Sequence, residues 1–61
     1  MNKQTQIILA KKILSEAGIT ESEYVISLQG PHIIPTQALS KSGRFTKKVR
    51  TELDLIGIKY F

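Results

Sequence analysis

The sequence predicts an all-α fold, a compact single domain of three to four short helices that spans residues 1–61. Apolar residues recur at helical spacing in two segments, with capping residues before these segments and glycines after them. No internal repeat, linker or low-complexity stretch divides the chain. An α+β fold is the alternative, with a small hairpin at 24–34 or a C-terminal strand. Because a chain of this size buries only about 60% of its unfolded surface, dimerisation or a bound partner would add stability.

The first helix is expected over residues 3–17. Asn2 is a good N-cap, and Gly18 stands where a glycine commonly closes a helix. Polar residues occupy one arc of this segment, and the apolar arc consists of Ile7, Ala10, Ile13, Leu14 and Ala17. The segment is therefore predicted to pack one face on the core.

A second helix is expected to begin at residue 21. Thr20 and Glu23 have the spacing of a capping box, and Ile19 and Tyr24 flank it as a hydrophobic staple. The helix should be short, because residues 25–27 are poor helix formers and a Gly-Pro pair follows at 30–31. The same residues could instead form a strand, with 24–28 pairing against 32–34. Pro35 would then restrict the second strand to the edge of a sheet.

The C-terminal third of the chain predicts two further helices. Thr36 can cap a brief helix that ends before Ser42 and Gly43. The last helix is expected over 46–56, with Thr46 as its cap and Gly57 as its stop. Its apolar arc consists of Phe45, Val49, Leu53 and Ile56. Residues 58–61 are expected to form a short strand or a tail folded onto the core.

The composition argues against catalysis and metal binding. The chain has no cysteine and one histidine, so a disulfide framework and a thiolate zinc site are excluded, and His32 is expected to be a turn residue. None of the five acids forms an obvious pair beside His32, and no nucleophile motif or phosphate-binding glycine loop is present. We therefore expect no enzyme, no catalytic residue, no cofactor and no small-molecule substrate.

The N-terminal segment indicates the location of the protein. Residues 7–10 form a four-residue apolar run, which Lys11 and Lys12 follow. This run is far shorter than the core of a signal peptide or a membrane span. We expect a cytoplasmic protein without a membrane partner.

A basic run is the feature that most directly suggests a function. Residues 41–50 contain no acid, although the whole chain has a net charge of only +4, and this run includes Lys41, Arg44, Lys47, Lys48 and Arg50. Three of these cations fall in the first turns of the predicted last helix, where the dipole disfavours each by about 0.3 to 1 kcal/mol. Such placement suggests selection for phosphate binding. The alternative is a solvated basic face, balanced by ion pairs of Lys48 with Glu52 and of Arg50 with Asp54.

The same region predicts a helix-turn-helix. The segment 36–41 would be the first helix, 42–45 the turn, and the helix from Thr46 the recognition helix. In this arrangement Lys47, Lys48 and Thr51 point toward base edges, while Lys41 and Arg44 hold phosphates. Two positions depart from the motif, because Leu39 stands where a small residue is usual and Glu52 where an apolar one is expected. The hypothesis is a small basic regulator that binds double-stranded DNA.

The middle of the chain suggests a different function. From residue 24 to residue 40 there is no formally charged residue apart from His32, and apolar residues are frequent. Because the cores of protein interfaces are depleted of charge, this segment could bind a larger protein or a second copy of the chain. The alternative hypothesis is therefore a small inhibitor or adaptor with Tyr24, Ile33 and Ile34 at its interface.

Overall fold

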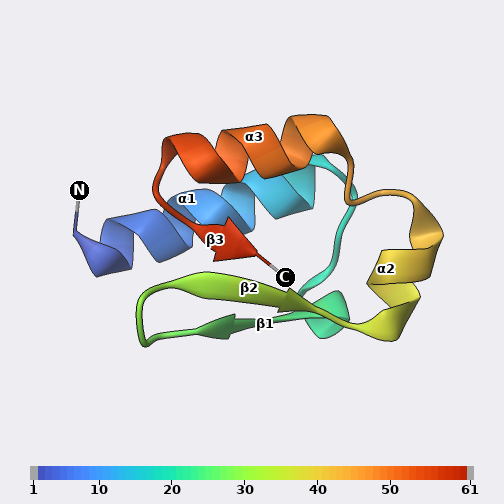
Figure 1. Cartoon of the computed structure of the whole chain (residues 1–61), viewed down its shortest axis with the longest axis horizontal. Helices are drawn as coiled ribbons and strands as arrows, with labels where there is room; N and C mark the ends of the chain where they lie inside the picture. The colour runs from blue at the N-terminus through green and yellow to red at the C-terminus, as the bar shows by residue number, and fades with distance from the viewer. Residues whose placement is uncertain (1, 61) are drawn as a thin grey trace.

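The computed structural model describes residues 2–60 and has an α+β fold (Figure 1). The chain forms helix α1, a single 3-10 turn η1, strands β1 and β2, helices α2 and α3, and strand β3. Their bounds in that order are Lys3–Glu16, Glu21–Glu23, Tyr24–Ser27, His32–Pro35, Gln37–Ser42, Lys47–Leu55 and Lys59–Tyr60. The strands form one mixed sheet in the order β1-β2-β3, in which β1 is antiparallel and β3 parallel to β2.

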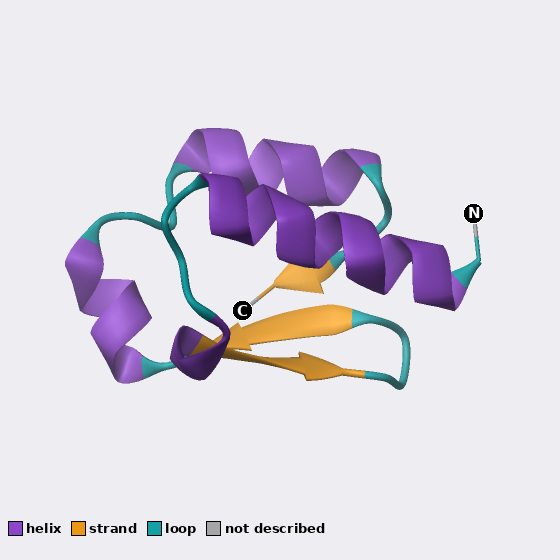
Figure 2. Cartoon of the chain, turned by 180° about the vertical axis from the view of Figure 1, so that it is seen from behind, coloured by secondary structure: helices purple, strands orange, loops and turns teal. Residues whose placement is uncertain are grey.

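The helices and the sheet form two layers. Figures 1 and 2 show α1 and α3 side by side over one face of the sheet, with α2 at one end. Helix α3 packs against α1 and β3, and α2 packs against β2. Within residues 2–60, no helix has the length and apolar character needed to cross a bilayer.

The all-α prediction is wrong, because residues 24–35 form a hairpin. The capping box does start a helical turn, since the Glu23 carboxylate accepts hydrogen bonds from the backbone N–H and the hydroxyl of Thr20 at 3.1 and 3.0 Å. This turn ends at once, because Val25 and Ile26 are β-branched and favour a strand. The α+β alternative is therefore the correct one, with both the hairpin and a C-terminal strand. Phe61, the last residue assigned to that strand or tail, lies outside the described residues.

Pro35 lies in the central strand β2 and not in an edge strand, contrary to expectation. It is the last residue of β2, and β3 pairs only with His32 and Ile33 at the other end of the strand. The missing N–H of Pro35 therefore interrupts no hydrogen bond to β3.

The predicted ends of α1, α2 and α3 are confirmed to within about a residue, because local hydrogen bonds define them. The Asn2 side chain accepts from the backbone N–H of Thr5 at 2.7 Å. Thr36 and Thr46 cap α2 and α3 by accepting from the N–H groups three residues later, each at 3.3 Å. After α3, Gly57 adopts a left-handed φ of 79°, and the chain turns back toward the sheet as β3.

The hydrophobic core lies between the two layers. Its buried side chains are those of Ala10, Leu14, Ile19, Tyr24, Ile33, Leu39, Phe45, Val49, Leu53 and Ile58. Every element except η1 and β3 contributes to this cluster, and Ile58 joins it from the residue before β3. The predicted inner and outer sides of α3 are thus confirmed. Val49 and Leu53 are buried, and Lys47, Lys48 and Thr51 are exposed.

Candidate nucleic-acid interface

The segment from α2 to α3 has the order of elements predicted for a helix-turn-helix. Residues 43–46 connect the two helices, and the turn begins at Gly43 with a left-handed φ of 75°. The Ser42 hydroxyl donates to the carbonyl of Leu39 at 2.8 Å and accepts from the N–H of Arg44 at 3.2 Å. However, α1 and β3 orient α3, while α2 packs on β2. The order of elements is therefore that of the motif, but the core that holds α3 is different.

Arg44 binds groups within the chain. Its Nη1 donates to the carbonyl oxygen of Gly18 at 2.7 Å and to Oε1 of Glu23 at 2.9 Å, and its Nη2 contacts the other carboxylate oxygen of Glu23. The pair is bidentate, and the Glu23 side chain is only 16% exposed. Arg44 thus fastens the α2–α3 turn to η1 and to the end of α1. The predicted phosphate contact of Arg44 would have to compete with these bonds.

Because of this ion pair, the free energy of unfolding is expected to change with pH in the acidic range. The Arg44 hydrogen bond, followed by that of the Thr20 backbone, lowers the pKa of Glu23 from its ordinary 4.5 to about 2. When the pKa of a carboxylate is lower in the folded state than in the unfolded state, the ionised group stabilises the folded protein. This stabilisation is complete above the pKa of the unfolded state and is lost as pH falls to the pKa of the folded state.

We expect Glu23→Gln to flatten the fall in unfolding free energy between about pH 4.5 and about pH 2. Urea unfolding at several acidic pH values measures this effect. Glu16→Gln is the matched control, because Glu16 has no ion pair among residues 2–60. If Glu23→Gln retains the acid sensitivity of the unmodified chain, the assignment is wrong.

The basic residues of α3 are distributed around the helix. Lys47 and Thr51 lie on the side opposite the buried Val49, and the Thr51 hydroxyl donates to the carbonyl of Lys47 at 2.9 Å. Lys48 lies on the flank that faces α1, where it lines a pocket. The guanidinium of Arg50 lies on the opposite flank, against Phe45 and Tyr60.

Arg50 is stacked on two aromatic rings. Its guanidinium carbon lies 5.1 Å from the ring centre of Phe45 and 5.7 Å from that of Tyr60, and these two rings meet edge to face at 5.7 Å. Cation–π contact fixes the long side chain beside β3. Arg50 is exposed, so its charge is held in a defined place at the surface.

The two ion pairs proposed to balance the basic face are absent from α3, all of which the structure describes. The ion pairs found within residues 2–60 are Lys11 with Glu21 at 3.5 Å and Arg44 with Glu23. Neither Glu52 nor Asp54 has an ion-pair partner in this part of the chain, and Asp54 instead accepts from the Tyr60 hydroxyl at 3.3 Å. Lys47, Lys48 and Arg50 therefore keep their positive charge at the unfavourable end of the helix dipole.

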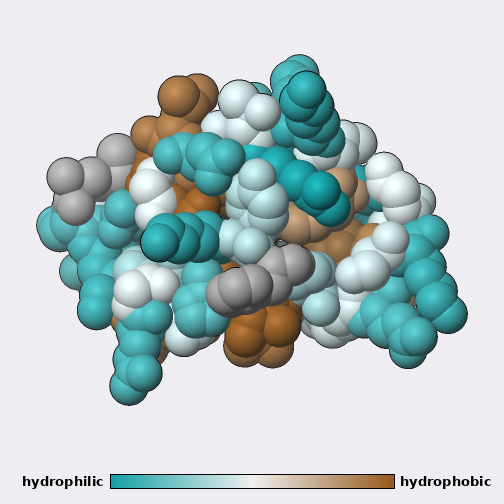
Figure 3. Space-filling model, viewed as in Figure 1, coloured by the Kyte–Doolittle hydropathy of each residue, from teal (hydrophilic) through white to brown (hydrophobic). Residues whose placement is uncertain are grey.

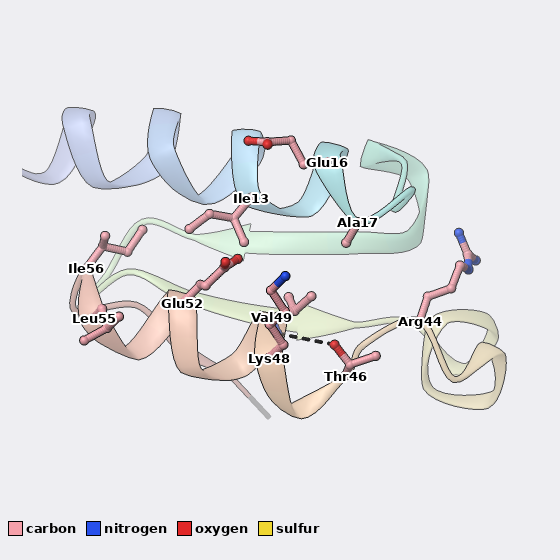
Figure 4. Close-up of a pocket in the computed structure, with 10 residues that line it drawn as sticks. All are labelled: Ile13, Glu16, Ala17, Arg44, Thr46, Lys48, Val49, Glu52, Leu55 and Ile56. Carbon is pink, nitrogen blue, oxygen red and sulfur yellow. Dashed lines mark hydrogen bonds between the residues drawn. The ribbon is translucent and has the colours of Figure 1, made fainter.

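A groove of about 590 Å³ lies between α3 and α1 at the surface. Figure 4 shows Glu16 on one helix and Lys48 and Glu52 on the other, above an apolar floor that includes Ile13 and Val49. Because this groove carries charges of both signs, the positively charged surface of α3 does not continue across it to α1. No cluster of three potential metal-ligating side chains occurs in residues 2–60.

The alternative interface residues are divided between the core and the surface. Tyr24 is 6% exposed and Ile33 is fully buried, whereas Ile34 is 44% exposed. Ile34 pairs across the hairpin with Val25, which is 59% exposed and was not predicted as an interface residue. The alternation of a strand would have identified Val25, because paired residues point to the same face of a sheet.

Comparisons with protein-family models, with curated proteins and with solved structures find no match for this chain. Its function has to be argued from its own surface.

Proposed function

We propose that this chain is a small DNA-binding regulator that contacts double-stranded DNA through the outward side of α3. Lys47 and Thr51 form the centre of this surface, with Arg50 on one flank, Lys48 on the other and Lys41 at the end of α2. The observation that carries the proposal is that three cations occupy the first two turns of α3 without an acidic partner in residues 2–60. Phosphates would offset the unfavourable helix dipole.

The packing of α3 supports this proposal. Leu53 is fully buried and Val49 is 5% exposed, so the helix is seated firmly and its outward side has a fixed orientation. A helix with its side chains is about 10–12 Å in diameter, and the major groove, about 12 Å wide, accepts one helix. Figure 3 shows hydrophilic side chains over the N-terminal half of α3 and apolar ones near its C-terminal end. DNA contact is therefore proposed for the N-terminal half.

The residue roles follow from these positions. Lys47, Lys48 and Thr51 are proposed to face base edges, and Lys41 and Arg50 to contact phosphates. Arg44 is proposed to have mainly a structural role, because its Nη1 and Nη2 bind Glu23 and Gly18. The proposed activity is binding alone, in the cytoplasm, with no catalytic step and no cofactor.

The salt dependence of binding to a fluorescent DNA duplex tests this proposal. Each phosphate contact contributes about −0.9 to the slope of log affinity against log salt concentration, so a slope of about −2 to −3 is expected. Fluorescence anisotropy at several salt concentrations gives this slope. An absence of binding at low salt, or an affinity that salt does not change, would contradict the proposal.

A further inference from the structure

Strand β1 has an open backbone edge. It is the outer strand of the sheet, with β2 on one side only, and Figures 1 and 2 show it along the border of the molecule. The N–H of Thr36 donates to the carbonyl of Glu23 at 2.9 Å, which fixes the phase of the antiparallel ladder. Alternation then directs the backbone groups of Val25 toward β2 and those of Ile26 away from it. The carbonyl of Tyr24 also faces outward.

This edge lacks the features that usually prevent strands from pairing. Natural edge strands carry lysine, proline or a bulge, or they are very short. The residues of β1 are uncharged and include no proline, and their register with β2 is continuous. The opposite edge differs, because β3 has only two residues and one of them is Lys59. The open edge of β1 is therefore suited to pair with another strand.

Apolar side chains lie on both faces of this edge. On the helix side, a pocket of about 360 Å³ lies between α1 and β1. It is lined by Ile7, Tyr24, Ile26 and Leu28 and by the ion pair of Lys11 with Glu21. On the outer face, Val25 and Ile34 are paired and exposed. An added strand would place alternate side chains against each of these two surfaces.

We propose that two copies of the chain form a symmetric dimer by antiparallel pairing of their β1 strands, with Val25 on the two-fold axis. In this register the N–H of Ile26 donates to the carbonyl of Tyr24 of the partner subunit, and symmetry repeats the bond. The two Val25 side chains lie directly opposite each other, and each has Ile34 of its own subunit beside it. The exposed aliphatic side chains thus form one continuous row across the joined sheet.

The charge distribution favours a second copy as the occupant. Glu21 and Glu23 precede β1, and in this register they lie opposite the uncharged Gln29 and Ser27 of the partner subunit, while Glu21 also pairs with Lys11 of its own subunit at 3.5 Å. The basic residues of α3 lie nearer the opposite edge of the sheet, because α3 packs against β3. Two chains of net charge +4 can therefore meet at an edge that is itself uncharged.

Complementary charges at position 25 test the dimer and its register. Lysine and glutamate substitutions are tolerated at this site by the fold, since Val25 is 59% exposed on the outer face. We expect the unmodified chain to sediment as a dimer, and Val25→Lys or Val25→Glu alone to weaken the dimer about 100-fold through opposed like charges. An equal mixture of the two variants should recover the dimer. Leu55→Lys is the matched control, because Leu55 is 81% exposed on α3.

Several outcomes would overturn the proposal. The proposal is wrong if the unmodified chain is monomeric at all concentrations, or if Val25→Lys dimerises as well as the unmodified chain. It is also wrong if the mixture of the two variants stays monomeric, or if Leu55→Lys dissociates the dimer. Hydrogen exchange of the unmodified chain gives a second measurement that does not depend on any variant folding. The Ile26 amide should become protected as protein concentration rises, and rapid exchange at all concentrations would also refute the dimer.

Discussion

Leu53→Ala is expected to reduce the free energy of unfolding by about 2 to 5 kcal/mol. Leu53 is fully buried and belongs to the core cluster that holds α3 in place. A domain of this size has a total stability of about 3 to 9 kcal/mol, so the loss would remove a large share of it. Urea unfolding followed by circular dichroism, at equal protein concentrations for both proteins, measures the difference.

Leu55→Ala is the control for this effect. Leu55 lies on the same helix and is 81% exposed, so its truncation should change the free energy of unfolding by less than about 0.5 kcal/mol. If both variants lose the same free energy of unfolding, α3 does not pack on the core through Leu53.

The double variant Lys47→Ala/Lys48→Ala is expected to weaken DNA binding by about 10- to 100-fold at low salt. The loss of two positive charges beside the DNA should also make the salt slope less steep. Both side chains are exposed at the start of α3, so the variant should remain folded. Fluorescence anisotropy of a labelled duplex, titrated with each protein at several salt concentrations, measures both quantities.

Lys3→Ala/Lys12→Ala separates a local site from the effect of net charge, because neither lysine has an ion-pair partner in residues 2–60. This control also removes two positive charges from the net charge of +4, but from the exposed side of α1. We expect it to bind DNA nearly as tightly as the unmodified chain. If both double variants lose affinity equally, bulk charge and not α3 accounts for the binding.

Much of the helical structure could be predicted because its signals are local. Asn2, Thr36 and Thr46 each cap a helix through a hydrogen bond to an N–H three residues later. The glycines that follow the helices also act within one turn of the chain. Such pairs are visible in the sequence without any knowledge of the tertiary structure.

The hairpin could not be assigned in the same way, because its ladder depends on pairing between two segments. The capping box at Thr20 marks where a helix can begin and carries no information about its length. Once 24–27 pair with 32–35, alternation places Ile33 in the core and Ile34 at the surface. In the sequence alone, Ile33 and Ile34 are equivalent interface candidates, because the strand register is not visible there.

The role of Arg44 depends on contacts that are distant in the sequence. Its carboxylate partner, Glu23, lies 21 residues earlier, and its carbonyl partner, Gly18, lies 26 residues earlier. The basic run therefore suggested a free cation where the fold has a bidentate ion pair. The exposure of Lys47, Lys48 and Thr51 was predictable, because helical periodicity alone determines which side chains of α3 face outward.

An NMR titration of the 15N-labelled protein with duplex DNA tests the proposed role of α3 most directly. We predict that the amide shifts change mainly at residues 46–51 and at Lys41, while those of β1 and β2 stay close to their free values. Changes centred on the hairpin, or no changes at a salt concentration low enough to permit phosphate binding, would contradict it.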